Sequence, residues 1–351
     1  MFLFGLGRGV VAAALSVVLG VAGGVSVRDE VRDRQWHLGF LGIAQAHTIS
    51  TGKGVIVGLI DSGVDAGHPD LVGSVLPGAD FDYTQGPNGQ TDNEGHGTAM
   101  AGIIAAHGRA LGIAPDATIL PVINGPTTST TAVNYAIDHG ATVLCLAFAG
   151  PYYNPGLDDA VARAVAADIV VVAGVGNTPA NRVQYPAALR GVVGAAAVDR
   201  DGNHAGVSVV SPVADLAAPG VDIMTPRARN VVPEGYGVGS GTSDATAIIA
   251  GVAALIRARY PQMSAAEVVH RMTATAIDRG VPGRDDEYGY GIVDPVAALT
   301  ADVPPLTPSV GPSNPTGSGG GFPIRTVAIA VGAAVVLLTG LVLALRLRRY
   351  P

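Results

Sequence analysis

Short apolar runs recur through the middle of the chain, and each is too short to cross a membrane. Most of their residues are Val, Ile, Leu, Ala or Thr, without the polar alternation of a strand that has one face in water. Continuous apolar runs of this length are typical of strands buried on both faces of a sheet. The runs predict strands at 55–60, 118–122, 142–148, 169–173 and 192–196.

The stretches between these runs have the composition and spacing of helices. We predict helices at Ala99–Ala106, Thr131–His139 and Leu157–Ala167, and an apolar helix that begins near Ser243. Strands that alternate with helices favour a parallel sheet, because each parallel connection crosses one face of the sheet. The sequence therefore predicts an α/β fold with a mostly parallel, twisted sheet and helices on both faces.

The apolar stretch Gly9–Val27 follows a short head that contains Arg8. A charged head followed by an apolar segment is typical of an export signal. We therefore expect residues 1–26 to be a signal peptide. An uncleaved N-terminal anchor is the alternative, because no clear small-residue cleavage site follows the apolar stretch.

A second apolar segment lies towards the other end. The run from Val327 to Leu345 contains no charged residue, and its length suits a bilayer, which needs about 20 residues. Three arginines follow the run and only one directly precedes it, and basic residues favour the cytoplasmic side. We expect a transmembrane helix at 325–346 and a cytoplasmic tail at 347–351, with a buried core helix as the alternative.

The segment before this run is rich in Pro, Gly and Ser, which is the composition of a flexible linker. We place the linker at 303–324. Residues 27–302 then form one globular body with a short N-terminal arm, and this length is sufficient for a single large core.

Charge and cysteine content narrow the functional classes. The formal net charge is −7 and only 14% of the residues are charged, with no basic stripe of the kind that binds nucleic acids. The single cysteine, Cys145, excludes an intramolecular disulfide within the chain. It lies inside a predicted strand, so we expect it to be buried rather than to be a catalytic nucleophile.

Three polar residues occupy places where α/β proteins gather their chemistry. Asp61 follows the first predicted strand, His96 lies between two glycines at a loop–helix junction, and Ser243 enters an apolar helix. Functional groups of parallel sheets collect at the carboxyl ends of strands. Asp61 also fits an ordinary turn residue, and Ser243 a simple helix N-cap.

Together these residues supply the parts of a nucleophilic hydrolase. A serine hydroxyl attacks when a base removes its proton, an imidazole does this near neutral pH, and a carboxylate holds the imidazole in the required tautomer. The order Asp, His, Ser along the chain is the order in subtilisin. We predict that Asp61, His96 and Ser243 form a catalytic triad.

The surrounding segments resemble the signature motifs of the subtilase family. They read Leu-Ile-Asp-Ser-Gly-Val at 59–64, Gly-His-Gly-Thr at 95–98 and Gly-Thr-Ser at 241–243. Residues 112–117 and 288–294 resemble two further family segments. The resemblance covers about residues 36–300. It implies a subtilisin-like fold and a serine endopeptidase that hydrolyses polypeptides through an acyl-enzyme intermediate.

The resemblance also implies residues that bind the substrate. Asn177 ends the segment Val-Val-Ala-Gly-Val-Gly-Asn and matches the family's oxyanion asparagine, with the Ser243 backbone N–H as the second donor. The structural alternative for Asn177 is a turn residue after a strand. The family's substrate-binding strand is matched by Ala147, Phe148, Ala149 and Gly150.

The chain departs from the family pattern near the active serine and in the substrate-binding strand. Ala149 stands where the family often has a glycine that lines the primary specificity pocket, so we expect a smaller or reshaped pocket. Asp244 and Ala247 replace a frequent methionine and a frequent proline. A carboxylate beside Ser243 disfavours further negative charge nearby.

The order of segments resembles that of the mycosins, subtilases associated with type VII secretion in actinobacteria. The shared layout is a signal, a short arm in place of a long pro-domain, a protease body, a proline-rich stalk and a membrane anchor. It implies a single-pass cell-membrane protein with an extracytoplasmic catalytic domain, which works beside the type VII secretion membrane complex. Family mycosins often carry disulfides, and this chain differs in that respect.

Two other functions are alternatives: a mainly structural subunit that stabilises a secretion complex, and a general cell-surface subtilase. A complete triad argues against a purely structural role. A metal-dependent hydrolase lacks support, because His68-Pro69-Asp70 and the other histidines do not have the spacing of a metal site. Asp92 and Glu94 flank His96 and fit solvated loop residues equally well. We expect no cofactor and assign no metal ligand.

Overall fold

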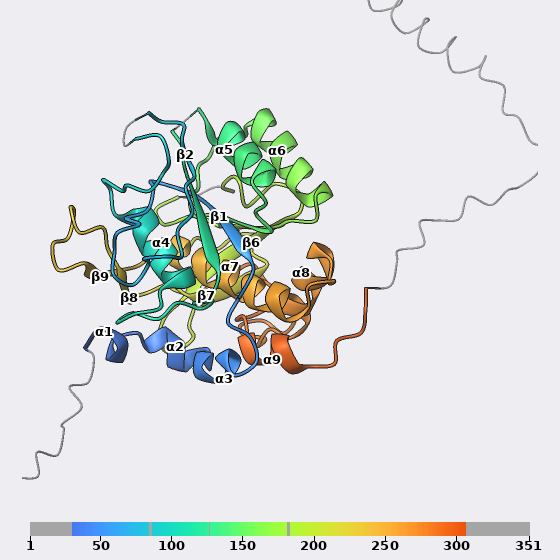
Figure 1. Ribbon diagram of the computed structural model, residues 1–351. Coiled ribbons are helices and arrows are strands. Elements are labelled where there is room, and N and C mark those ends of the chain that lie inside the picture. Colours follow the sequence, from blue (N-terminus) through green and yellow to red (C-terminus); the bar gives the residue numbers. More distant parts are fainter. Residues whose placement is uncertain (1–29, 84–85, 126, 181–182, 307–351) are drawn as a thin grey trace, which may run out of the picture. The chain divides into compact units, whose positions relative to one another are not determined.

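The computed structural model describes residues 30–306, apart from 84–85, 126 and 181–182 (Figure 1). All of these residues belong to one unit of the chain, which ends at Leu306. Within this part of the chain, no helix is both long and apolar enough to cross a bilayer.

Several expectations about the ends of the chain lie outside the described residues. These are the signal peptide at 1–26, the transmembrane helix at 325–346 and the tail at 347–351. Most of the linker expected at 303–324 also lies outside them.

Seven parallel strands form the central sheet, in the order β2-β3-β1-β4-β5-β6-β7. A separate antiparallel pair consists of β8 and β9. The mostly parallel sheet predicted from the sequence is confirmed. The strands are β1 (Ile56–Asp61), β2 (Ala79–Asp80), β3 (Thr118–Ile123), β4 (Val143–Leu146), β5 (Val170–Gly174), β6 (Val192–Val198), β7 (Leu216–Pro219), β8 (Ile223–Pro226) and β9 (Tyr236–Gly239).

Helices cover both faces of this sheet, as predicted. One face packs against α4 and α7, and the other against α5 and α6, which lie side by side (Figure 1). The helices are α1 (Glu30–Asp33), α2 (Trp36–Phe40), α3 (Ile43–His47), α4 (His96–Ala105), α5 (Ser129–Asp138), α6 (Pro155–Ala166), α7 (Thr242–Arg259), α8 (Ala265–Ala274) and α9 (Pro295–Thr300).

Successive strand residues enter different cores, which explains why the strand sequences are apolar throughout. In β1, Leu59 belongs to the core on the α4 and α7 side, whereas Ile60 belongs to the core on the α5 and α6 side. In β4, Cys145 belongs to the core on the α4 and α7 side, and Leu144 to the core on the α5 and α6 side. A strand buried on both faces has no position for a polar side chain.

The five predicted strands correspond to β1, β3, β4, β5 and β6. β4 ends at Leu146, two residues before the predicted end, and the chain that follows leaves the sheet. The register pairs Ile60 with Leu146, and Leu146 with Ala173. The carboxyl ends of β1, β4 and β5 therefore lie at one edge of the sheet.

Candidate active site

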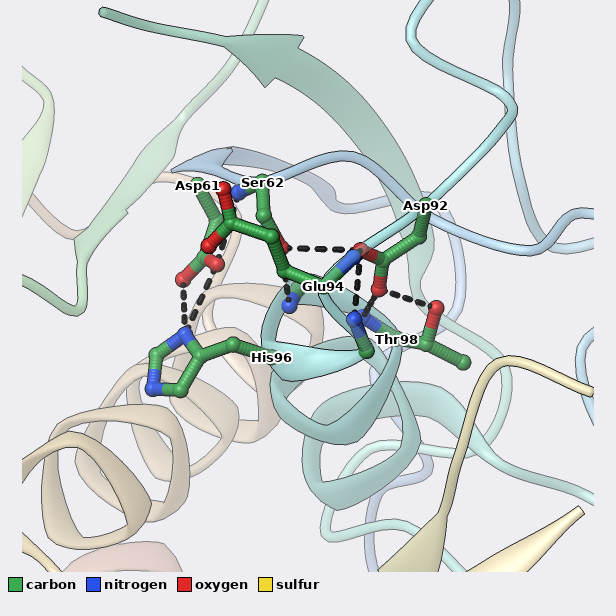
Figure 2. A network of polar contacts seen from close by, with 8 residues as sticks. Asp61, Ser62, Asp92, Glu94, His96 and Thr98 are labelled. Carbon is green, nitrogen blue, oxygen red and sulfur yellow. Dashed lines mark hydrogen bonds and ion pairs between the residues drawn. The ribbon is translucent and has the colours of Figure 1, made fainter. Parts of the chain in front are cut away.

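The first two predicted triad residues meet at this edge. Asp61 is the last residue of β1 and His96 is the first residue of α4. Nδ1 of His96 lies 2.7 Å from Oδ1 and 3.0 Å from Oδ2 of Asp61 (Figure 2). The side chain of Asp61 is 5% exposed and that of His96 is 40% exposed, so the imidazole projects from a buried carboxylate towards solvent.

The surroundings of His96 favour its protonated form. Burial lowers its pKa, but the charge and hydrogen bond of Asp61, together with the charge of Asp244, outweigh burial and raise the pKa to about 9. The carboxylate of Asp61 also fixes the proton of a neutral imidazole on Nδ1, which leaves Nε2 as an acceptor.

Ser243, the third predicted residue, lies in the first turn of α7 and is half-buried. It shares a cavity of about 400 Å³ with His96, Asn177 and the segment 147–149. No hydrogen bond between Ser243 and His96 occurs in the described part of the chain. Such bonds often tighten only when substrate is bound.

Asn177 is held in one orientation by the start of α7. Its Oδ1 accepts hydrogen bonds from the backbone N–H of Thr242 at 2.9 Å and from the Thr242 hydroxyl at 3.1 Å. Because both donors require the amide oxygen, the NH₂ group is the end left for the cavity. A Cβ atom on Gly241 would be 3.2 Å from both Nδ2 of Asn177 and Oγ of Ser243, so these two atoms flank the same point.

A buried carboxylate, Asp92, organises the loop that carries His96. It is 1% exposed and accepts hydrogen bonds from the Ser62 hydroxyl and from the backbone and hydroxyl of Thr98 (Figure 2). It also accepts the backbone N–H of Glu94 and Gly95. The sequence fitted Asp92 to a solvated loop residue, and its burial excludes that role: the carboxylate is a hydrogen-bond acceptor inside the loop.

Ser62 links this network to the first turn of α4. Its hydroxyl donates to Asp92 at 3.0 Å and accepts the backbone N–H of Gly97 at 2.9 Å. The backbone at Gly97 lies close to that of Gly63, since a Cβ atom on Gly97 would be only 2.0 Å from the carbonyl oxygen of Gly63. Any side chain at position 97 would therefore push His96 away from Asp61.

The segment predicted to bind substrate lines an open cleft beside His96. Ala147, Phe148, Ala149 and Gly150 contribute to a cavity of about 700 Å³ that also includes Asp61 and His96. Gly150 exchanges two backbone hydrogen bonds with Tyr185, at 2.9 and 2.7 Å. The cleft is lined further by Tyr152, Tyr153, Leu157 and the carboxylates Asp82 and Glu94.

Other candidate residues have structural roles. Cys145 is fully buried in β4, as predicted, and burial raises the pKa of its thiol, which opposes thiolate chemistry. His68 and Asp70 are also buried: the imidazole contacts the carbonyl of Gly235, and the carboxylate accepts the backbone N–H of Arg109 and Ala110. In the described part of the chain, no three His, Cys, Asp or Glu side chains are grouped to hold a metal ion.

Residues 52–291 match the family model of the subtilases. The chain belongs to the subtilase family. Among curated subtilases, it is 35% identical to subtilisin DY of Bacillus licheniformis over 261 residues, which covers 70% of this chain and 91% of the relative. It is 33% identical to mycosin-1 of Mycobacterium tuberculosis over 337 residues, covering 78% and 74% of the two chains.

Solved subtilase structures agree with these relatives. A crystal structure of MycP1 with its N-terminal propeptide removed has a TM-score of 0.69 and 28% identity, and covers 77% of this chain and 98% of that one. The MycP3 protease from the type VII (ESX-3) secretion system has a TM-score of 0.67 and 29% identity, covering 76% and 88%. This chain is therefore a subtilisin-like serine endopeptidase, and its resemblance to the mycosins is confirmed.

Proposed function

We propose that this subtilase hydrolyses peptide bonds with Asp61, His96 and Ser243 as its catalytic triad. The observation that carries the proposal is the 2.7 Å contact between Asp61 and His96, whose imidazole lines the same cavity as Ser243. The carboxylate holds the imidazole so that Nε2 can take the proton of the serine hydroxyl.

The reaction follows from these positions. Oγ of Ser243 attacks the carbonyl carbon of the peptide bond, and its proton moves to Nε2 of His96. The oxyanion receives hydrogen bonds from the amide of Asn177 and the backbone N–H of Ser243, close to the positive end of α7. His96 then protonates the departing amine. Water, activated by the same imidazole, releases the acyl group from Ser243.

The backbone of Ala147–Gly150 would hold the acyl side of an extended substrate. β4 ends at Leu146, and the residues after it are not paired within the sheet. Their backbone is therefore available to pair with an extended substrate. At Gly150 the backbone N–H and C=O already bond to Tyr185, so substrate pairing should end before this residue.

Hydrolysis of a denatured protein substrate tests the triad. We expect Ser243→Ala, His96→Ala and Asp61→Asn each to lower kcat by about 10⁴-fold or more. The kcat of the triple variant should be no lower than that of the least active single variant. Ser240→Ala is the matched control, because this exposed serine lies in the same segment and its hydroxyl accepts the backbone N–H of Asp222. Full hydrolysis by folded Ser243→Ala would refute the proposed triad.

We further propose that the enzyme processes exported polypeptides beside a type VII secretion membrane complex. The likeness to mycosin-1 and to a protease described as part of a type VII system supports this context. The apolar run from Val327 to Leu345, with arginines after it, supports a single membrane anchor with the protease body outside the cell.

Complementation of a deletion strain separates proteolysis from scaffolding. If the enzyme processes exported proteins, Ser243→Ala restores the secretion complex but leaves its substrates uncleaved. If the protein is purely structural, Ser243→Ala restores everything that the wild type restores. A chain that ends before residue 325 should appear in the medium, and its retention in membranes would contradict the proposed anchor.

A further inference from the structure

Asp244 follows Ser243 directly in the first turn of α7 and is only 3% exposed. Its Oδ1 atom has no hydrogen-bond partner in the part of the chain that the structure describes. A buried carboxylate without a partner is costly, because desolvation penalises its charged form. The proposed reaction does not use this side chain, although it is the nearest neighbour of the nucleophile in the sequence.

The carboxylate of Asp244 and the guanidinium of Arg227 meet beside Gly239 in β9. A Cβ atom on Gly239 would lie 3.4 Å from Oδ1 of Asp244 and 2.8 Å from Nη2 of Arg227. Arg227 follows β8 and runs along β9, since a Cβ on Gly237 would lie 3.1 Å from its Cγ. The two charged groups do not form a direct ion pair in the described residues, so the arginine compensates the carboxylate only in part.

The same elements pack around His96. α4, which begins at His96, contacts both α7 and β8, and the Thr225 hydroxyl of β8 donates to the carbonyl of Ala99 at 2.8 Å. The charged groups that act on the imidazole are Asp61 from β1, Asp244 from α7 and Arg227 from the end of β8, and Asp82 and Glu94 line the same cleft as His96.

The electrostatic effects of Asp244 and Arg227 on His96 are opposite in sign. The charge of Asp244 raises the pKa of His96, and the charge of Arg227 lowers it. The pKa of Asp244 itself is raised to about 7 by burial, against the attraction of His96 and Arg227. Asp244 and His96 therefore each favour the ionised form of the other.

We propose that Asp244 is a positioning residue that acts through His96, as a second anionic partner of the imidazole that Arg227 opposes. The inference rests on the proposed role of His96 as the base that activates Ser243. Asp244 favours the imidazolium, which cannot accept the serine proton. It thereby adds to the larger effect of Asp61 and moves the activity of the nucleophile towards higher pH.

The rate at which a fluorophosphonate labels Ser243, measured against pH in the full-length protein, tests this inference. In Asp244→Asn, which keeps the shape of the side chain and removes its charge, we expect the acid limb of the profile to move to lower pH. Labelling at pH 7 would then be roughly severalfold faster. In Arg227→Gln we expect the limb to move to higher pH.

Opposite shifts distinguish this role from a structural one. A purely structural Asp244 or Arg227 would lower the rate at every pH and leave the limb in place, and that result would overturn the inference. Asp201→Asn is the control, because it removes one exposed carboxylate that does not line the cleft, and its profile should match the wild type. If Asp244→Asn does not fold, a limb in Arg227→Gln that stays or moves to lower pH overturns the inference.

Titration of His96 by NMR separates this inference from the proposed function. The His96 resonance is the one absent from the spectrum of His96→Ala. If the wild type is not labelled at any pH, the proposed triad fails, but the effect of Asp244 is still decided by this titration. A lower pKa of His96 in Asp244→Asn supports the inference, and an unchanged pKa overturns it even when labelling requires Ser243.

Discussion

The side-chain oxygen of Asn177 lies 2.9 Å from the backbone nitrogen of Thr242, the residue before the proposed nucleophile. The contact fixes which end of the amide faces the cavity, and it separates two roles of Asn177: an acceptor for α7 and a donor for the oxyanion. Two substitutions can therefore remove one role or both.

We expect Asn177→Asp to keep the acceptor and lose the donor, so that kcat falls by about 10² to 10³-fold while the free energy of unfolding changes little. Asn177→Ala loses both, so it should show a similar fall in kcat and also a loss of about 1 kcal/mol in stability. Peptide hydrolysis and urea unfolding measure the two effects. A kcat at the wild-type level in either variant would exclude Asn177 from the oxyanion site.

Asp92 is predicted to stabilise the loop before His96 and, through it, catalysis. Asp92→Ala leaves the Ser62 and Thr98 hydroxyls and several backbone N–H groups without their acceptor, so we expect a loss of about 3 kcal/mol or more in the free energy of unfolding. Ser62→Ala removes one member of the network and should cost about 1 kcal/mol. Urea unfolding checks both values.

The control for Asp92 is Asp116→Asn, an exposed carboxylate that accepts one side-chain hydrogen bond, from Thr51. It should change stability by less than about 0.5 kcal/mol. If Asp92→Ala were as mild as this control, the network would not hold the loop.

Ala149 is predicted to limit the size of the residue that enters the specificity pocket. Ala149→Gly removes one methyl group from the segment that lines the cavity beside Ser243. We expect the ratio of kcat/KM for a substrate with Phe before the scissile bond to that for one with Ala to rise about tenfold or more. Ala167→Gly, an exposed position at the end of α6, should leave the ratio unchanged. An equal ratio in Ala149→Gly and the wild type would remove Ala149 from the pocket.

His37 is predicted to make the protein sensitive to acid. It is fully buried in α2, neither ring nitrogen has a hydrogen-bond partner within the described chain, and burial lowers its pKa from 6.5 to about 3. Between these values the unfolded chain binds a proton that the folded chain does not. The free energy of unfolding is therefore unaffected by this titration above pH 6.5. As the pH falls from 6.5 towards 3, it decreases by about 1.4 kcal/mol for each pH unit.

Replacement of His37 by leucine removes this titration. We expect His37→Leu to have a higher Tm than the wild type below pH 6, and the difference in Tm to grow as the pH falls. Thermal unfolding at a series of pH values measures this. His139→Gln changes an exposed histidine that stacks on Tyr135 and should keep the wild-type pH dependence. The same pH dependence in His37→Leu and the wild type would contradict the account.

The sheet was predictable because its strands are buried on both faces and are therefore apolar throughout. Because Leu59 and Ile60 enter different cores, the run is apolar throughout, and its short length and β-branched residues indicate a strand. β7, with the sequence Leu-Ala-Ala-Pro, was not predicted, since a four-residue run with two alanines and a final proline does not resemble a strand without its neighbour β6.

The proposed catalytic residues were recognisable because each lies at the end of a strand or the start of a helix. The supporting residues were not, because their roles depend on contacts between distant segments. Asp92 looks like any loop carboxylate until Ser62 and Thr98 surround it. Asp244 stood out as a substitution beside Ser243, but neither its burial nor its proximity to Arg227 can be read from the local sequence.

The most direct test of the account is labelling of the full-length protein with a fluorophosphonate probe at alkaline pH, followed by mass spectrometry of the modified peptide. The account predicts a single modified residue, Ser243, with labelling lost in Ser243→Ala and His96→Ala and retained in Ser240→Ala. Equal labelling of folded Ser243→Ala and the wild type would contradict it, because the activated nucleophile would then be another residue.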